Sequence, residues 1–402
     1  MNTPSLPPSP AARPSTGPVA PPSAGPAAPV PFDPAHPGWS ALAASMQALG
    51  GTLHADAQGP QFRASAPAPA PAGEPSAIDG LCPLPDYGLL IAAGAEAGSF
   101  LQNQLTNDVL SMPAGEARWA GYCTPKGRLL TTALAWSLPG GFALAVARTQ
   151  AESLRKRLSM YVLRTKAKIT DASADWLAVG LLGESIDPAL AAVGLSRPDP
   201  AMAVSRRADA DQGVGPVAIA LPPAPAGVAR VMLWLPLADA DGPRAEAPAE
   251  LAALRAAGPV RDTALWRWTE VRSGVPRLFP GSVELFVPQM VNFEAIGGVN
   301  FKKGCYPGQE IVARSQYLGK LKRRMFVGHL AVDAAAALPD PGQDVVPRSG
   351  GEPSGQVVIS APNPAGGVDV LFESQIAAVE QAGVRIGDVD VELQALPYEV
   401  KR

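Results

Sequence analysis

Residues 299–325 read Val-Asn-Phe-Lys-Lys-Gly-Cys-Tyr-Pro-Gly-Gln-Glu-Ile-Val-Ala-Arg-Ser-Gln-Tyr-Leu-Gly-Lys-Leu-Lys-Arg-Arg-Met, with one cysteine. Gly304 and Gly308 flank Cys305, and Pro307 restricts the backbone between them. Glycine and proline favour tight turns over regular helices and strands. The pattern therefore predicts that Cys305 is presented on a turn and is exposed to solvent.

The same stretch is strongly basic. Between Phe301 and Met325 there are seven Lys or Arg residues and one acid, Glu310, although the whole chain has a formal net charge of -3. A nearby cation stabilises a thiolate, which is the nucleophile, the redox-active form and the metal ligand. Cys305 is therefore a candidate reactive cysteine. The structural alternative is that free cysteines are mostly small buried hydrophobes and that a basic run is usually a solvated face.

The run Lys303-Gly304-Cys305-Tyr306-Pro307-Gly308-Gln309-Glu310, followed by Ile-Val-Ala-Arg314, resembles the signature of the folate-binding YgfZ family. These proteins are iron–sulfur cluster assembly and repair factors related to the glycine-cleavage T-protein, an aminomethyltransferase. The resemblance extends from about Leu84 to the C-terminus and is weak at about 195–260. Further segments that resemble the family are residues 100–109, 121–128 and 286–298.

The resemblance implies a cytosolic, folate-binding accessory factor that assembles or maintains 4Fe–4S clusters in client enzymes, including radical enzymes that thiolate tRNA. The implied cofactor is tetrahydrofolate. Cys305 would supply a thiolate for transient ligation of iron or sulfide, or for thiol exchange. Lys303 and Arg314 would hold that thiolate and a nearby anion such as the glutamate tail of folate. Gln309 and Glu310 would orient the turn.

A pterin is a flat aromatic ring, so its site needs a stacking side chain and a few hydrogen-bonding groups in an otherwise apolar pocket. In the family, such contacts come from aromatic residues at positions that match Tyr87 and Trp266. Asn107, Gln289 and Asn292 are the polar groups that we expect near the same cleft. Periodicity alone favours a core position for Trp266, because apolar aromatics at helical spacing mostly pack in the interior.

At some positions the sequence differs from the relatives, and these differences affect whether aminomethyl transfer is expected. T-protein carries an aspartate pair after its glycine turn, whereas residues 127–132 read Gly-Arg-Leu-Leu-Thr-Thr and contain no carboxylate. Aminomethyl transfer is therefore not expected. The Glu-Ala-Gly of both relatives is Arg272-Ser273-Gly274 here, and Pro307 replaces the usual Thr or Ser, which predicts a stiffer turn.

Two alternatives from other function classes stay open. One is a tetrahydrofolate-dependent one-carbon transferase or demethylase, against which the missing aspartate argues. The other is a scaffold without chemistry, whose basic run docks an acidic partner protein or tRNA. In the scaffold, neutralising Lys320, Lys322, Arg323 and Arg324 would weaken partner binding, and replacing Cys305 would have no effect.

Length and composition limit the number of domains and the kinds of partner that we expect. A chain of 402 residues, 47% hydrophobic and 17% charged, is typical of a globular protein with two or three domains. No apolar run reaches the roughly 18 residues of a membrane span, so no membrane association is expected. A net charge of -3 gives no global case for nucleic-acid binding, and such contact is expected to be only indirect or weak.

The three cysteines, Cys82, Cys123 and Cys305, are far apart and include no Cys-x-x-Cys pair. This is not a disulfide framework, and an odd count suits a reducing cytosol. Together with three scattered histidines, these residues cannot build a four-cysteine iron–sulfur site or a conventional zinc site. A permanently bound metal is therefore not expected.

Composition divides the chain into four parts. Residues 1–37 hold 13 of the 45 prolines and are expected to be disordered, because such a segment buries too little apolar surface to offset its ordering entropy. It also lacks the charged start and apolar core of a signal peptide, so export is not expected. Residues 38–83 are expected to hold a short helix, Trp39 to Leu49, and an Ala/Pro linker.

The remaining residues mix strand and helix patterns. Residues 84–324 are expected to form an α+β, T-protein-like body around a central folate cleft, and residues 325–402 a small β-barrel. The expected strands are 87–92, 128–136, 142–146, 177–182, 231–235, 326–330, 356–359, 368–372 and 389–393, and the expected helices 95–105, 150–163, 248–257 and 263–273.

Overall fold

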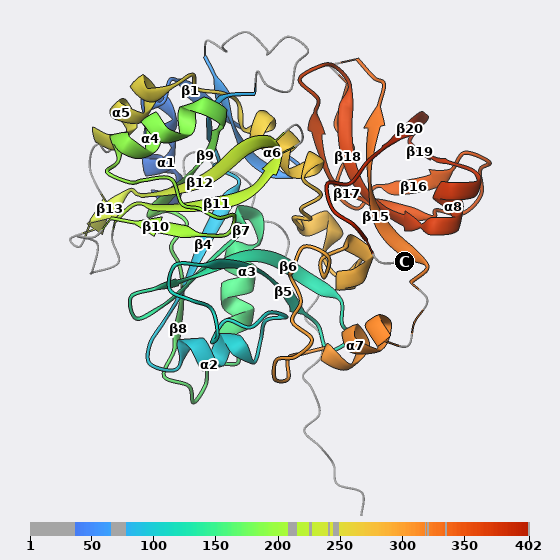
Figure 1. Ribbon diagram of the computed structural model, residues 1–402, viewed down its shortest axis with the longest axis horizontal. Coiled ribbons are helices and arrows are strands. Elements are labelled where there is room, and N and C mark those ends of the chain that lie inside the picture. Colours follow the sequence, from blue (N-terminus) through green and yellow to red (C-terminus); the bar gives the residue numbers. More distant parts are fainter. Residues whose placement is uncertain are drawn as a thin grey trace, which may run out of the picture.

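The computed structural model of the chain describes residues 37–65, 78–207, 215–224, 227–239, 242–243, 249–317, 319, 321–333 and 336–400. The expected disorder of residues 1–37 therefore falls outside the described residues except at Pro37, and so does most of the Ala/Pro linker. Two five-stranded sheets and a closed barrel make up the body of the molecule (Figure 1). No helix among the described residues combines the length and apolarity that crossing a membrane requires.

The first sheet has the strand order β5-β6-β7-β4-β8, and its strands are all antiparallel. Successive side chains on a strand point to opposite faces. Leu90 on β4 accordingly packs with helices α2 and α3 on the outer face, whereas Leu89 points to the interior. The bounds are β4 Tyr87–Ala93, α2 Ala97–Gln102, β5 Ala117–Cys123, β6 Leu129–Leu138, β7 Gly141–Ala147, α3 Arg148–Ser159 and β8 Lys168–Asp171.

The second sheet has the order β10-β11-β12-β9-β3. Its outer face packs with α1, α4 and α5, and its inner face joins the inner face of the first sheet. Trp234 of β12 meets Tyr87 at 6.4 Å and Trp136 at 5.7 Å between ring centroids. The bounds are α1 Pro37–Ala48, β3 Gly80–Pro83, β9 Trp176–Leu182, α4 Ile186–Ala192, β10 Val204–Arg206, β11 Val217–Ala224, β12 Val228–Pro236 and α5 Ala249–Ala257.

The segment expected to be a helix and a linker contains more structure than that. After α1, strands β1 (Gly51–Asp56) and β2 (Gly59–Ala64) form a hairpin, and β3 pairs with β9, so the ordered body does not begin at Leu84. Phe62 of the hairpin is buried beside Leu42. The backbone N–H of Phe62 also donates to Thr263 Oγ1 at 2.8 Å. The contact of Phe62 with Thr263 crosses 201 residues of chain, which is why local patterns did not predict it.

Helix α6 (Thr263–Arg272) joins the sheets to the barrel. Its Trp268 donates its indole N–H to the buried Asp369 on β18 at 2.8 Å. The expected C-terminal barrel is confirmed as a closed structure of order β15-β18-β17-β16-β19-β20. The bounds are β15 Arg323–Leu330, β16 Asp344–Pro347, β17 Gly355–Pro362, β18 Val368–Gln375, α8 Ile376–Gln381, β19 Val384–Ile386 and β20 Val389–Gln394.

Candidate functional site

The turn that carries Cys305 lies directly before α7 (Gln309–Tyr317), and the Cys305 side chain is exposed. Gly308 has a φ of +79°, and a Cβ at this position would lie 2.4 Å from the Thr124 carbonyl oxygen. A Cβ on Gly304 would meet nothing within 4 Å. Gly308 is therefore the glycine that the turn requires, because it brings the turn against residues 124–127 between β5 and β6.

Lys303 points into the protein. Its ammonium donates to the carbonyl oxygens of Gln102 and Leu105, and it lies 5.3 Å from the centroid of the Tyr306 ring. Burial lowers the pKa of Lys303 to about 8, against the opposing attraction of Asp108. The Lys303 ammonium thus ties the turn to the end of α2, and no described contact links it to the sulfur of Cys305.

The rest of the basic run divides into two groups. Arg323 pairs with Glu373, and Arg324 pairs with Glu294, so these two cations hold β15 in place. Lys302, Arg314 and Lys322 are exposed. Lys320 lies outside the described residues. The accessible positive charge beside Cys305 therefore comes from fewer side chains than the sequence count indicates.

The other two thiols are buried. Burial raises the pKa of Cys82 well above its ordinary value and that of Cys123 to about 12. A thiol in this state is neutral at neutral pH and is protected from reagents.

We expect iodoacetamide to alkylate Cys305 in the folded protein and to leave Cys82 and Cys123 unmodified, because only the first is exposed. Intact mass spectrometry should show one adduct under native conditions and three after denaturation. Rapid labelling of a second thiol in the folded protein would contradict this accessibility.

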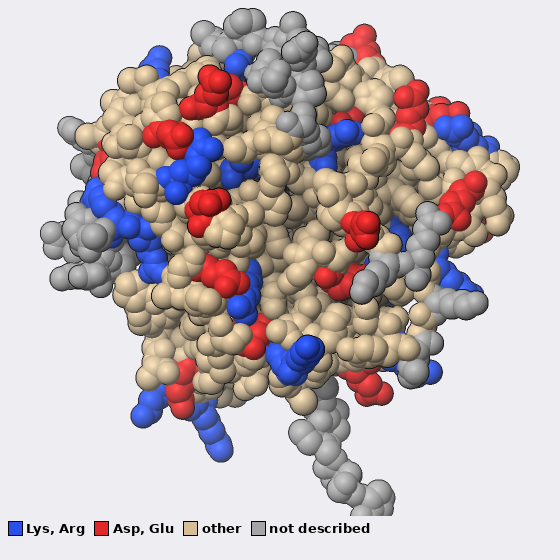
Figure 2. All heavy atoms as spheres, in the orientation of Figure 1, with Lys and Arg blue, Asp and Glu red and all other residues tan. Residues whose placement is uncertain are grey.

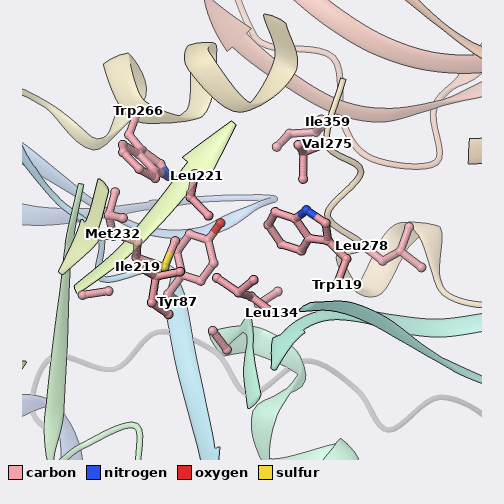
Figure 3. Packing of buried hydrophobic residues seen from close by; sticks show 14 of the residues in the cluster. Tyr87, Trp119, Leu134, Ile219, Leu221, Met232, Trp266, Val275, Leu278 and Ile359 are labelled. Carbon is pink, nitrogen blue, oxygen red and sulfur yellow. The ribbon is translucent and has the colours of Figure 1, made fainter. Parts of the chain in front are cut away.

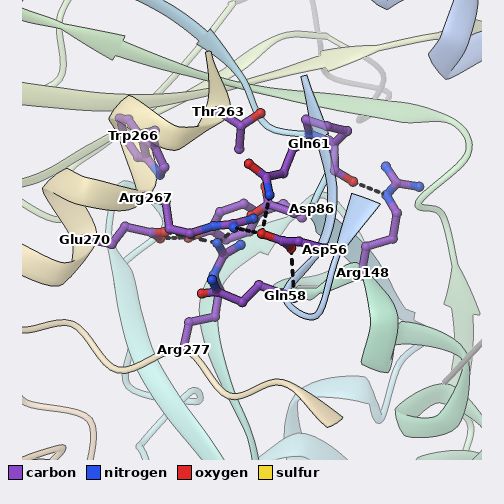
Figure 4. A network of polar contacts seen from close by, with 12 residues as sticks. Asp56, Gln58, Gln61, Asp86, Arg148, Thr263, Trp266, Arg267, Glu270 and Arg277 are labelled. Carbon is purple, nitrogen blue, oxygen red and sulfur yellow. Dashed lines mark hydrogen bonds and ion pairs between the residues drawn. The ribbon is translucent and has the colours of Figure 1, made fainter. Parts of the chain in front are cut away.

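Tyr87 contacts a buried polar network that contains Asp86, Arg267, Glu270 and Arg277, and Figure 4 shows these four side chains. Its hydroxyl donates to Glu270 Oε1, and the guanidinium of Arg277 lies 4.1 Å from the centroid of its ring. Arg277 also donates to Asp86 Oδ2 at 2.6 Å and to Glu270 Oε2 at 3.1 Å. A second arginine, Arg267, donates to the same Asp86 oxygen at 3.1 Å.

The pKa values of the two carboxyls of this network shift in opposite directions. Burial alone would raise the pKa of Asp86, but the guanidinium groups of Arg277 and Arg267 outweigh it and hold that pKa below its ordinary value. Burial raises the pKa of Glu270, and the attraction of Arg277 only partly offsets it. Asp86 is therefore the stable anion of the pair.

Trp266 is fully buried on α6. A Cβ on Gly180 of β9 would lie 2.2 Å from its ring, and the guanidinium of Arg230 lies 5.3 Å from the ring centroid. A planar ligand that stacks on this indole must therefore share the ring with Arg230 or displace it. Trp266 and Tyr87 both border the interior cluster between the two sheets (Figure 3).

Several buried polar atoms in this region have no hydrogen-bond partner among the described residues. They are Nε and one terminal nitrogen of Arg277, Oδ1 of Asp86, and the indole nitrogens of Trp136, Trp234 and Trp266. Buried polar groups are normally paired, so unpaired donors and acceptors mark a place where a ligand could complete the bonding. Figure 3 shows the Tyr87 hydroxyl pointing toward the space between Leu221 and Trp119.

The three amides expected near the cleft bind backbone groups elsewhere. Asn107 donates to the carbonyls of Trp119 and Gly297. Gln289 donates to Val312 O at 2.8 Å, and Asn292, whose φ is +53°, donates to Met325 O at 2.8 Å. These bonds join the loop before Cys305 to β5, α7 and β15. Their placement at a folate site stays a prediction.

The structure brings the sequence-predicted residues together as two groups. The turn with Lys303, Cys305 and Arg314 adjoins α7, whereas Tyr87 and Trp266 lie between the sheets. Figure 1 shows α7 and α6 well apart, and no described contact links Cys305 to either ring. Among the described residues, no group of three His, Cys, Asp or Glu side chains could hold a metal ion.

Asp86, Arg230, Glu270 and Arg277 were missed by the sequence analysis. Charged residues are normally exposed, and α6 alternates charged with apolar residues without a clear polar face. The only available signal was the position of Asp86 immediately before Tyr87 at the start of an apolar strand.

Two positions that the sequence singled out have structural roles. Arg272 places a guanidinium nitrogen 3.7 Å from Asp369 of the barrel. Thr132, on the strand without a carboxylate, donates its hydroxyl to Pro276 O at 3.0 Å. Both side chains therefore help to hold the fold together.

Comparison with known proteins identifies sequence relatives of the chain and a solved structure with a similar fold. No protein-family model matches the chain. It is 32% identical over 251 residues to the tRNA-modifying protein YgfZ of Edwardsiella ictaluri (strain 93-146), covering 60% of this chain and 69% of the relative. It is 30% identical over 243 residues to the protein of the same name from Vibrio vulnificus (strain CMCP6), covering 60% and 68%.

A longer match, to tRNA-modifying protein YgfZ of Enterobacter sp. (strain 638), is 27% identical over 331 residues and covers 80% of this chain and 94% of the relative. Among solved structures, the glycine cleavage system aminomethyltransferase T from Bartonella henselae matches with a TM-score of 0.61 and 16% identity, covering 89% of this chain and 96% of that one. The match to this solved structure confirms the expected T-protein-like fold.

Proposed function

The chain belongs to the YgfZ family, and on that premise we propose that it is a cytosolic, folate-binding accessory factor that assembles or repairs 4Fe–4S clusters in client enzymes. The clients would include enzymes that modify tRNA, in keeping with the name of the relatives, tRNA-modifying protein YgfZ. The observation that carries the proposal is the exposed Cys305 on a turn held from both sides, by Gly308 against residues 124–127 and by Lys303 at α2.

Cys305 would act as a transient ligand for iron or sulfide, or in thiol exchange. A single accessible thiol suits a transfer role, because one ligand holds a metal fragment without trapping it. Lys303 fixes the backbone of the turn through two carbonyls, so it would act as a positioning residue. Lys302 and Arg314 would supply the exposed positive charge that favours a thiolate and attracts an anion.

The folate would bind between the two sheets, beside Tyr87 and Trp266. The buried, unpaired donors of Arg277 and the two sheet tryptophans, with the unpaired oxygen of Asp86, fit a pterin, whose edge carries both donors and acceptors. When bound, tetrahydrofolate would supply a one-carbon acceptor. Without a carboxylate in residues 127–132, we propose no aminomethyl transfer at this site.

We expect Trp266→Leu to weaken tetrahydrofolate binding by about three- to tenfold, because one aromatic stacking contact is lost. Isothermal titration calorimetry with tetrahydrofolate measures the change. The matched control is Trp268→Leu, which removes another buried indole from α6 but one that bonds to the barrel. Circular dichroism should confirm that both variants are folded.

Equal losses in the two α6 variants would indicate a general packing effect, and unchanged affinity in Trp266→Leu would remove this residue from the site. If the unmodified chain binds no folate, the cofactor part of the proposal is wrong.

A further inference from the structure

The connection between α3 and β8 has an unusual charge. Residues 155–168 read Arg-Lys-Arg-Leu-Ser-Met-Tyr-Val-Leu-Arg-Thr-Lys-Ala-Lys, with six basic residues and no acid. The sequence alone favours a solvated helix face for the first three of these cations. The structure instead shows α3 ending at Ser159, with the remaining residues in an exposed connection.

Large apolar side chains are exposed in this connection. Met160 is 59% exposed, Tyr161 50% and Leu163 90%. Three neighbouring side chains of this kind on one loop are costly to hydrate, and such patches mark interaction surfaces. They also leave the tyrosine ring free to stack on a partner.

The cations at the end of the connection are free to bind a partner. Arg164, Lys166 and Lys168 are exposed, and none forms an ion pair with any residue in the described part of the chain. By contrast, Arg155 and Lys156 both pair with Glu152 on α3, at 2.7 and 3.3 Å. The free charge is thus concentrated beyond the end of the helix, next to the apolar side chains.

The connection is anchored beside the Cys305 turn. The cation of Arg157 lies near the hydroxyl of Tyr122 on β5, where its attraction opposes the rise in the pKa of Tyr122 that burial causes. Tyr122 forms a β-bridge with Leu105, whose carbonyl oxygen accepts from the Lys303 ammonium at 2.5 Å. One strip of residues therefore links the basic connection to the base of the turn.

The neighbouring turn and helix continue the same surface character. Lys126, Lys302 and Arg314 are exposed, and Tyr317 of α7 is 70% exposed. Figure 2 shows Lys and Arg side chains projecting from the end of the molecule where Figure 1 places α2 and β8. Exposed cations and two exposed tyrosines thus lie along the side of the body that carries β8, α2 and α7 in Figure 1.

We propose that this surface, formed by residues 156–168 together with Lys126, Lys302, Arg314 and Tyr317, binds RNA directly. The cations contact phosphates, and the tyrosine rings stack on unpaired bases. An acidic protein would use the cations, but it has no particular need for exposed tyrosines between them. The inference goes beyond the proposed function, since it requires neither folate nor the thiol, and it replaces the expectation of only indirect nucleic-acid contact.

The test is fluorescence anisotropy of the full chain with labelled, unfractionated tRNA over a range of salt concentrations. We expect Arg164→Glu/Lys168→Glu to bind at least about tenfold more weakly than the unmodified chain. The slope of log affinity against log salt should decrease in magnitude by about 1.4 to 1.8, which corresponds to two lost phosphate contacts. Tyr161→Ala should weaken binding by about fivefold or more without changing that slope.

The matched control is Arg63→Glu/Arg255→Glu, which reverses two exposed cations on β2 and α5 and changes the net charge equally. These elements lie at the opposite end of the body in Figure 1, so tRNA binding should change little. All four side chains are exposed, and circular dichroism verifies folding.

Equal losses in the two double variants would overturn the proposal in favour of non-specific charge attraction. So would a chain that binds labelled poly-L-glutamate but not tRNA, a result that assigns the surface to an acidic protein. The variants retain Cys305 and Trp266, so these results are independent of the thiol and folate roles.

Discussion

Replacing Cys305 with alanine is expected to abolish the ability of the protein to restore iron–sulfur enzyme activity in cells that lack it, while leaving its fold intact. The side chain is exposed and packs against no core cluster, so its removal should change the free energy of unfolding by less than about 0.5 kcal/mol. Its sulfur is the only accessible thiol among the described residues. The measurement is the level of thiolated tRNA in a complemented strain, together with the urea unfolding midpoint.

Two further variants make the result specific. Cys305→Ser keeps the size of the side chain but not the thiolate chemistry, and it should fail in the same way as alanine. Cys123→Ala removes a buried thiol that takes no part in the proposed chemistry, so it should retain activity in whatever fraction remains folded. Full activity of Cys305→Ala would exclude the thiol from the mechanism and favour the scaffold alternative.

Replacing Asp86 with alanine is expected to lower the free energy of unfolding by about 3–5 kcal/mol, because it leaves buried cations uncompensated. Asp86 is 1% exposed and accepts from Arg267 and Arg277, which are 1% and 4% exposed. Urea denaturation measures the loss. The control is Asp187→Ala, whose exposed pair with Arg197 should contribute less than about 1 kcal/mol.

The contribution of Asp86 to the free energy of unfolding should also depend on pH. The folded-state pKa of Asp86 lies below its ordinary value of 3.8, so its stabilisation is fully present above that value and is lost as the pH falls through the folded-state pKa. Burial raises the pKa of Glu270, so the contribution of that carboxyl to stability is lost as the pH rises through its folded-state pKa. The stability difference between the unmodified chain and Asp86→Ala should therefore shrink in acid. If Asp86→Ala is no more costly than Asp187→Ala, this network does not stabilise the packing of β4 against α6.

Local patterns predicted much of the fold. The strand expected at 177–182 is β9, Trp176–Leu182, and the helix expected at 263–273 is α6, Thr263–Arg272. The helix expected at 95–105 is shorter, because α2 spans only Ala97–Gln102. The hairpin of β1 and β2 was missed because its strands are short and its partners lie on α6, far along the chain.

The turn at Cys305 was predictable from the sequence, although the segment against which it packs was not. A glycine at 308 permits a positive φ and a close approach to the backbone of residues 124–127, and no larger side chain would do so without strain. Exposure of the thiol follows from that turn. The apolar runs that form the central strands of both sheets are likewise local features, because a strand buried on both faces needs apolar residues at nearly every position.

The partners of the buried charged side chains were decided by tertiary structure. Lys303 and Lys302 are adjacent in sequence, yet one binds buried carbonyls while the other is exposed. Arg277 meets Asp86 across 191 residues, and the unpaired Arg164 lies nine residues from the paired Arg155. The position of a charged residue in the sequence does not show which way its side chain points. Its pairing depends on which elements pack together, and that packing is set by the burial of apolar surface over the whole chain.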